Sequence, residues 1–167
     1  MHHIGCQKNR WSVAAILPAV IWGVQFASAA EPPADLCSLL PASQVTRTLG
    51  KAFDSPQKSV APRPFRDTAE GTDCRYQARS GGGVWFRAYV DPSPSASAAL
   101  FDRLAAFYSP PTPVSGLADQ AYFDKNHGLH VRKGKVRYFL QLSGMGPFTP
   151  ERQKQLEDLA SGIAAQL

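Results

Sequence analysis

Alternation of apolar and polar residues, bounded by turn residues, marks five segments of this chain as β-strands. The pattern is clearest from Val84 to Val90, where apolar residues alternate with Trp85, Arg87 and Tyr89. Side chains two residues apart point to the same face of a strand, so these three residues share one face and the apolar residues share the other. The remaining predicted strands are 74–79, 120–124, 129–133 and 135–143.

Apolar residues spaced three or four apart predict three helices. Their approximate ranges are 36–49, 95–108 and 149–167. Pro41 divides the first into a short turn and a helix of about two turns, and Gly50 ends it. The prolines of segment 109–113 end the second. The third has a clear start, with Thr149 as the N-terminal cap and Pro150 at the first helical position.

The order of these elements is helix, two strands, helix, three strands, helix, which is typical of an α+β domain. We expect one antiparallel sheet of about five strands covered by about three helices, similar to PsbP-like folds. Segment 51–73 is rich in proline, serine and charge, which predicts a long irregular loop. Residues 31–167 are sufficient for a single domain with its own core, but not comfortably for two.

The first thirty residues have the organisation of a secretory signal peptide. Lys8 and Arg10 precede an uncharged apolar run from Trp11 to Phe26, and small residues follow at 27–30. The run has 16 residues, fewer than the roughly 20 that span a bilayer. We therefore expect cleavage near residue 30, no membrane span afterwards, and a periplasmic or secreted protein.

Two cysteines, Cys37 and Cys74, remain once the leader is removed. An isolated pair in an oxidising compartment favours a disulfide, whereas a zinc site would need further cysteines or histidines nearby. Closure of this loop would stabilise the fold by roughly 3–4 kcal/mol in the chain-entropy model. The sequence therefore predicts a structural disulfide.

The net charge is mildly positive, falling from +5 to +3 when Lys8 and Arg10 leave with the leader. So small an excess, on an exported protein, does not indicate a nucleic-acid partner. The basic residues are most concentrated at a predicted hairpin tip, where they are Arg132, Lys133, Lys135 and Arg137. Two interpretations are open: the tip contacts anionic lipid headgroups, or it is a solvated turn whose charges discourage aggregation.

The strand face formed by Trp85, Arg87 and Tyr89 is the main candidate binding surface. If the helices cover only the opposite side of the sheet, these residues form an exposed aromatic platform for a sugar, a peptide or a protein. The alternative is that a helix or loop covers this face while the guanidinium of Arg87 extends outward. The sequence leaves both open.

A catalytic or metal site is not recognisable. His127 and His130 lie three residues apart on extended chain and would point to opposite faces, a poor arrangement for a shared metal. Nucleophile-elbow, phosphate-loop and metalloprotease motifs are absent from the sequence. Asp91, Asp119 and Asp124 are explained by turns and caps at strand ends. We therefore expect no cofactor, although a hydrolase would most plausibly use His130 and Asp119.

Several short motifs together resemble a known family. They are Cys37-Ser38-Leu39-Leu40, Leu49-Gly50, Cys74-Arg75-Tyr76, Gly116-Leu117-Ala118-Asp119-Gln120-Ala121-Tyr122 and Val131-Arg132-Lys133-Gly134. The chain is similar to a domain-of-unknown-function family of exported bacterial proteins, many of them lipoproteins. That family opens with Cys-Ser-Leu-Leu, pairs this cysteine with one that opens a later strand, and carries a Gly-Leu-Gly-Asp-x-Ala-aromatic turn.

The resemblance implies an exported α+β domain with a disulfide, and it implies no activity. Three departures from the family pattern matter. Pro41 stands where a Ser or Thr cap is usual, Ala118 replaces the second glycine of the turn, and the cysteine that would carry a lipid anchor is missing.

These observations favour a non-enzymatic exported protein that binds another protein or an envelope component such as a polysaccharide. One alternative is a small periplasmic inhibitor that inserts a proline-rich loop, Pro56–Pro64 or Pro110–Pro113, into an enzyme. The other is a hydrolase with an unrecognised site. The sequence does not predict the oligomeric state.

Overall fold

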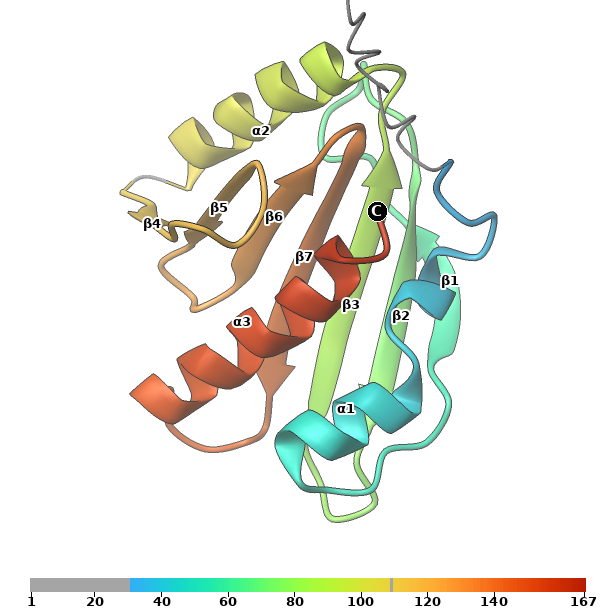
Figure 1. Cartoon of the computed structure of the whole chain (residues 1–167), viewed down its shortest axis with the longest axis vertical. Helices are drawn as coiled ribbons and strands as arrows, with labels where there is room; N and C mark the ends of the chain where they lie inside the picture. The colour runs from blue at the N-terminus through green and yellow to red at the C-terminus, as the bar shows by residue number, and fades with distance from the viewer. Residues whose placement is uncertain (1–30, 109) are drawn as a thin grey trace, which may run out of the picture.

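A computed structural model describes residues 31–108 and 110–167, which form a single antiparallel sheet with three α-helices (Figure 1). The predicted α+β class is therefore confirmed. The sheet has seven strands in the order β1-β2-β3-β7-β6-β5-β4, so the expected number of about five was too low. The predicted signal peptide, residues 1–30, lies outside the described residues.

Most element boundaries fall within a few residues of those predicted. The strands are β1 (Gln57–Ala61), β2 (Gly71–Gln77), β3 (Gly83–Val90), β4 (Thr112–Pro113), β5 (Gln120–Phe123), β6 (Leu129–Lys133) and β7 (Val136–Ser143). The helices are the 3-10 helix η1 (Leu36–Leu39), α1 (Ala42–Leu49), α2 (Pro94–Phe107) and α3 (Pro150–Ala164).

The two unpredicted strands, β1 and β4, are the edges of the sheet. In β1 only Ala61 is buried, so the strand carries no alternation of apolar and polar residues. β4 has two residues and ends at Pro113, inside the segment predicted as a helix stop. An edge strand tolerates proline because one of its sides has no hydrogen-bond partner, which is why the proline of β4 was misleading.

The helix boundaries follow local capping chemistry. The Thr149 hydroxyl accepts a hydrogen bond from the backbone N–H of Arg152, as the predicted start of α3 requires. Ser93 caps α2 in the same way. α1 ends at Gly50, whose φ of +66° is a left-handed conformation that favours glycine.

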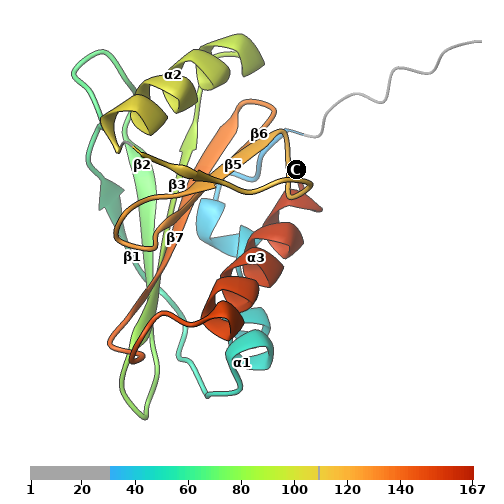
Figure 2. The same cartoon turned by 90° about the vertical axis from the view of Figure 1, so that its left-hand side faces the viewer.

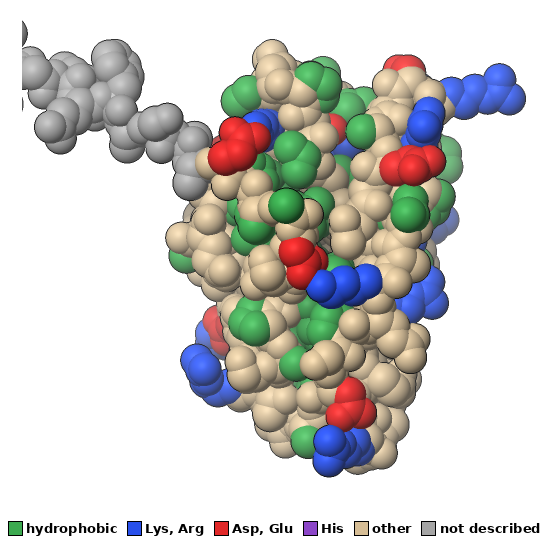
Figure 3. Space-filling view, turned by 90° about the vertical axis from the view of Figure 1, so that its right-hand side faces the viewer, with side chains coloured by type: hydrophobic (Ala, Val, Ile, Leu, Met, Phe, Trp, Pro, Cys, Tyr) green, Lys and Arg blue, Asp and Glu red, His purple; other side chains and the backbone are tan. Residues whose placement is uncertain are grey.

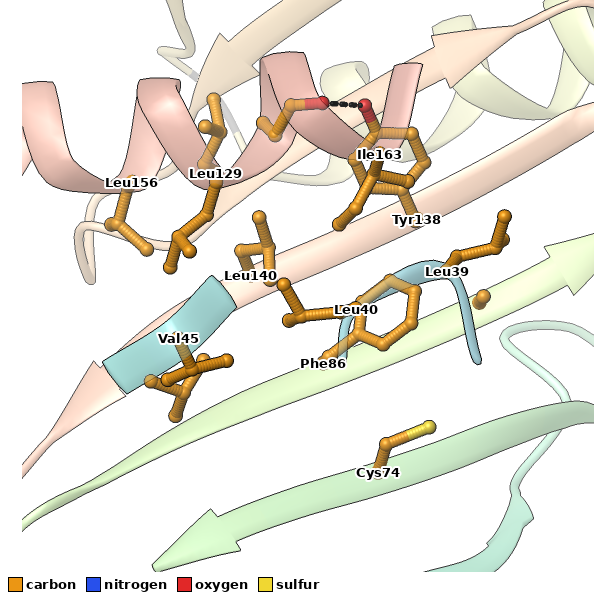
Figure 4. Packing of buried hydrophobic residues seen from close by; sticks show 14 of the residues in the cluster. Leu39, Leu40, Val45, Cys74, Phe86, Leu129, Tyr138, Leu140, Leu156 and Ile163 are labelled. Atoms are coloured by element: carbon orange, nitrogen blue, oxygen red, sulfur yellow. Dashed lines mark hydrogen bonds between the residues drawn. The ribbon is translucent and has the colours of Figure 1, made fainter. Parts of the chain in front are cut away.

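Helices η1, α1 and α3 cover one face of the sheet, and the main core lies between them and the strands (Figure 2). The buried side chains labelled in Figure 4 are Leu39, Val45, Leu156 and Ile163 from the helices, Leu40 from the residue after η1, and Cys74, Phe86, Leu129, Tyr138 and Leu140 from the strands. The hydroxyl of Tyr138 donates a 2.7 Å hydrogen bond to the carbonyl of Ala160 in α3. The helix layer and the sheet are therefore joined by a buried hydrogen bond in addition to apolar contacts.

A disulfide between Cys37 and Cys74 ties η1 to β2, with their Cα atoms 5.8 Å apart. The predicted pairing is therefore confirmed. Next to it, the hydroxyl of Tyr76 donates to the backbone carbonyl of Leu40. Within residues 31–108 and 110–167, none of the helices has the length and hydrophobicity needed to cross a bilayer.

Candidate functional site

The second face of the sheet is only partly covered. α2 lies across one end of it, on the side opposite α1 and α3 (Figure 2). The segment Pro62–Phe65, the first part of the connection from β1 to β2, closes a second side. Between them and the strands is a cavity of about 480 Å³, which is within the size range of small-molecule sites.

Phe, Tyr and Trp side chains are the largest group of residues in the cavity wall. They come from the connecting segment, from β3, from α2 and its C-terminal cap, and from β7. The residues are Phe65, Trp85, Tyr89, Phe101, Phe107, Tyr108, Tyr138 and Phe139. Phe107 is 75% exposed and forms the rim, whereas Phe101 is buried against Tyr122 with ring centroids 5.0 Å apart.

The predicted trio of Trp85, Arg87 and Tyr89 lines this cavity together. Neither interpretation of the strand face describes it fully, because α2 and the connecting segment cover the face in part and leave it hollow. The Trp85 indole N–H donates to the carboxylate of Asp73 on β2. The Tyr89 hydroxyl donates to the carbonyl of Pro62 at 2.9 Å, and burial raises the pKa of this tyrosine.

Two arginines, one exposed and one largely buried, lie over the ring of Trp85. The guanidinium carbon of Arg87 lies 4.5 Å from the indole centroid and that of Arg75 lies 5.0 Å from it. The Arg75 side chain is 63% exposed, whereas that of Arg87 is 21% exposed and lines the cavity. Both contact the carboxylate of Asp73, which therefore organises this wall.

Arg137 does not belong to a basic hairpin tip. Its side chain is 4% exposed, lines the cavity, and forms a bidentate ion pair with Asp91 at 2.6 and 2.9 Å. The prediction placed it with the tip because it lies close to Gly134 in sequence. In β7 it instead shares a face with Phe139, which also lines the cavity.

The other tip residues are paired with acidic groups. Arg132 and Lys133 contact the carboxylate of Asp119 at 3.1 and 3.7 Å. Lys135 contacts Glu31 at 2.7 Å. On the face drawn in Figure 3, Lys and Arg side chains are interspersed with Asp and Glu in the same manner. The four predicted residues therefore do not form one unpaired cationic surface, which weakens the interpretation as an anionic-membrane contact.

His130 lies at the other end of the cavity with Asp124. Its Nε2 is 3.0 Å from the Asp124 carboxylate, and its ring is stacked on Tyr122 with centroids 4.7 Å apart. Burial alone would raise the pKa of Asp124. The hydrogen bonds from His130 and from the backbone N–H groups of Gly128 and Asn126 outweigh it, so that the pKa is lowered.

The arrangement does not bring His130 together with Asp119. Asp119 lines a separate hollow with residues of α2, β5 and the segment after β4. His127 stacks on Phe148 with centroids 4.3 Å apart, outside the cavity. Among the described residues no cluster of three or more His, Cys, Asp or Glu side chains is arranged to hold a metal ion.

The proline-rich segment before β2 folds back onto the domain. The Arg103 guanidinium on α2 lies 3.7 Å from the Phe65 ring centroid and pairs with Asp67 at 3.1 Å. These contacts and the bond from Tyr89 to Pro62 tie the segment to the cavity wall. The second proline-rich segment contributes β4. Both segments are therefore held against the sheet, which does not favour the proposed loop insertion.

Sequence reasoning missed the acidic partners Asp73 and Asp91 and the role of α2 in forming a wall. Alternation along β2 places Asp73 on the same face as Arg75, so this signal was present in the sequence. The pairing of Asp91 with Arg137 had no comparable signal, because the residues are 46 positions apart.

Comparison of the chain with models of protein families gave no match, and comparison with curated protein sequences gave none either. The resemblance to the exported domain-of-unknown-function family therefore stays a prediction.

Proposed function

We propose that the chain is an exported, non-enzymatic binding protein that holds a small, largely apolar ligand in the aromatic cavity between α2 and the sheet. The observation that carries this proposal is the cavity itself, about 480 Å³ with Phe, Tyr and Trp as the largest group of residues in its walls. Pockets of this size and composition bury most of the surface of a drug-sized molecule. The ligand would be a component of the cell envelope or its surroundings.

The polar groups around the cavity support binding because they hold the walls in place. The Asp91 carboxylate is occupied by Arg137, and the Asp124 carboxylate by His130 and two backbone N–H groups. A pocket whose walls are fixed before the ligand arrives loses less entropy on binding. Export and the PsbP-like likeness are further parts of the proposal that rest on the sequence alone.

The test uses a neutral environment-sensitive dye, N-phenyl-1-naphthylamine, with protein purified after expression of the full chain. We expect a saturable rise in dye fluorescence with one site per molecule. The variant Leu104→Trp places a large ring at a cavity-lining position of α2 and should weaken binding at least tenfold.

The matched control is Ala106→Trp, which introduces the same side chain at an exposed position of α2 outside the cavity. This variant should bind the dye like the wild type. Equal binding by both variants, or a fluorescence rise that does not saturate, would contradict the proposal.

A further inference from the structure

Three arginines line the cavity: Arg63 pairs with Glu70 at 3.6 Å, and the other two, Arg87 and Arg137, differ in how many of their N–H donors are occupied. This inference rests on the proposed function and names the charged group of the ligand. Arg137 is saturated on the side that faces Asp91, because both carboxylate oxygens accept its N–H groups at 2.6 and 2.9 Å. Arg137 is buried and held by this ion pair, so its role is to fix the position of the cavity wall.

Arg87 retains most of its hydrogen-bonding capacity. A guanidinium has five N–H donors in a planar fork. The hydrogen bond of Arg87 to a carboxylate within residues 31–108 and 110–167 is long, from Nη2 to Asp73 at 3.5 Å, and its other polar neighbour is the Tyr89 hydroxyl, where Arg87 opposes the rise that burial causes in the tyrosine pKa. The Arg87 Nε is buried and has no partner among those residues. A buried donor without an acceptor is costly, and it shows that Asp73 does not saturate this guanidinium.

The charge around Arg87 is also uncompensated. The Asp73 carboxylate accepts from the Trp85 indole and contacts Arg75 and Arg87 at 3.4 and 3.5 Å. One negative charge is thus shared between two positive ones, which leaves this end of the cavity positive. At the other end the Asp124 carboxylate is already occupied by donors. The cavity therefore has spare donors and positive charge, and a cationic ligand would meet the wrong sign.

We propose that Arg87 binds the carboxylate of a small organic acid whose flat apolar body lies against the aromatic walls. The planar fork of a guanidinium matches the two oxygens of a carboxylate. Stacking on Trp85, 4.5 Å from the ring centroid, holds the guanidinium while leaving its N–H groups free at its edges. Trp85 is itself held by its hydrogen bond to Asp73 and by an edge-to-face contact with Phe139, with ring centroids 5.6 Å apart.

The experiment compares 2-naphthoate with its neutral analogue 2-naphthylmethanol by isothermal titration calorimetry. The two molecules share their ring system and differ in the charged group. We expect the wild type to bind the carboxylate about ten- to a hundredfold more tightly, the range expected for a charge-assisted hydrogen bond. The variant Arg87→Gln should bind both compounds with equal affinity.

The matched control is Arg75→Gln. Arg75 contacts the same carboxylate and the same indole ring, but it does not line the cavity. This variant should keep the preference for naphthoate. Preference retained in Arg87→Gln, or lost equally in both variants, would overturn the assignment of Arg87.

A measurement on the wild type covers the case in which Arg87→Gln does not fold. In ¹⁵N-labelled protein, naphthoate should shift an arginine Nε–H resonance that naphthylmethanol leaves in place, and an unmoved resonance would overturn the inference. Equal binding of the two compounds by the wild type would also overturn it while leaving the proposed function standing. Binding of neither compound, together with no dye binding, would overturn both.

Discussion

Asp73 and Arg87 face each other across β2 and β3 as register partners, yet their side chains approach only to 3.5 Å. The same carboxylate anchors the indole of Trp85 and contacts Arg75. One acidic residue therefore holds two groups of the cavity wall, Trp85 and Arg87, in position. Because its charge is divided between two arginines, the wall is both rigid and positive, and this combination is the basis of the proposed carboxylate site.

Reduction of the Cys37–Cys74 disulfide should lower the stability of the protein by about 3–4 kcal/mol, because the unfolded chain regains the conformational entropy that the closed loop had removed. The midpoint of thermal unfolding of the reduced protein should lie roughly 10 °C below that of the oxidised protein. Thermal denaturation followed by circular dichroism, with and without reductant, measures the change. The double variant Cys37→Ala/Cys74→Ala should start at the lower midpoint and not respond to reductant.

Removal of two buried tyrosine hydroxyls should have different effects on the stability of the protein. Tyr76→Phe removes the donor that contacts the carbonyls of Leu40 and Cys37, so the free energy of unfolding should fall by about 1–3 kcal/mol. The Tyr122 hydroxyl is buried without a partner among the described residues. Tyr122→Phe should therefore leave stability unchanged or raise it. Urea denaturation of both variants tests the comparison, and a larger loss in Tyr122→Phe would contradict it.

The buried ion pair of Asp91 and Arg137 should be sensitive to removal of one partner. Asp91→Asn leaves a guanidinium that is 4% exposed without its counter-charge, which we expect to cost about 3–5 kcal/mol of unfolding free energy. Asp54→Asn removes the partner of Arg79 in an exposed pair and should cost less than about 1 kcal/mol. Similar losses in chemical denaturation of the two variants would argue against the structural importance of the buried pair.

The stabilising contribution of the Asp124 carboxylate should be lost in acid. Its pKa in the folded state is lowered from the usual value of 3.8, so the folded form favours the charged carboxylate. This contribution is present above the unfolded pKa and is lost as the pH falls through the lower folded pKa. The stability advantage of the wild type over Asp124→Asn should therefore shrink as the pH falls below about 4.

Urea denaturation of the wild type and Asp124→Asn between pH 5 and pH 2 measures this advantage. The comparison of two proteins is needed because the pKa of Asp35 is also lowered, chiefly by its hydrogen bond from Lys58, and that residue titrates in the same window. An advantage that is independent of pH would show that the Asp124 carboxylate is not held in its charged form.

The elements with strong local signals were predictable. In β3 the alternation of residues places Trp85, Arg87 and Tyr89 on one face, and the structure has them lining one cavity. The caps at Thr149 and Gly50 act within a single turn of chain, so they too can be identified from neighbouring residues. The edge strands β1 and β4 had no such signal, because their side chains are mostly exposed and alternation is not required.

The sequence by itself determined which residues share a strand face, where the helices begin and end, and which cysteines were available to pair. Tertiary structure alone decided that α2 covers only part of the second sheet face, that Arg137 meets Asp91, and that Arg87 is left with unused donors. The physical reason is range. Periodicity and capping act between neighbours in the chain, whereas a cavity and its charge balance arise from elements that meet only when the sheet is assembled.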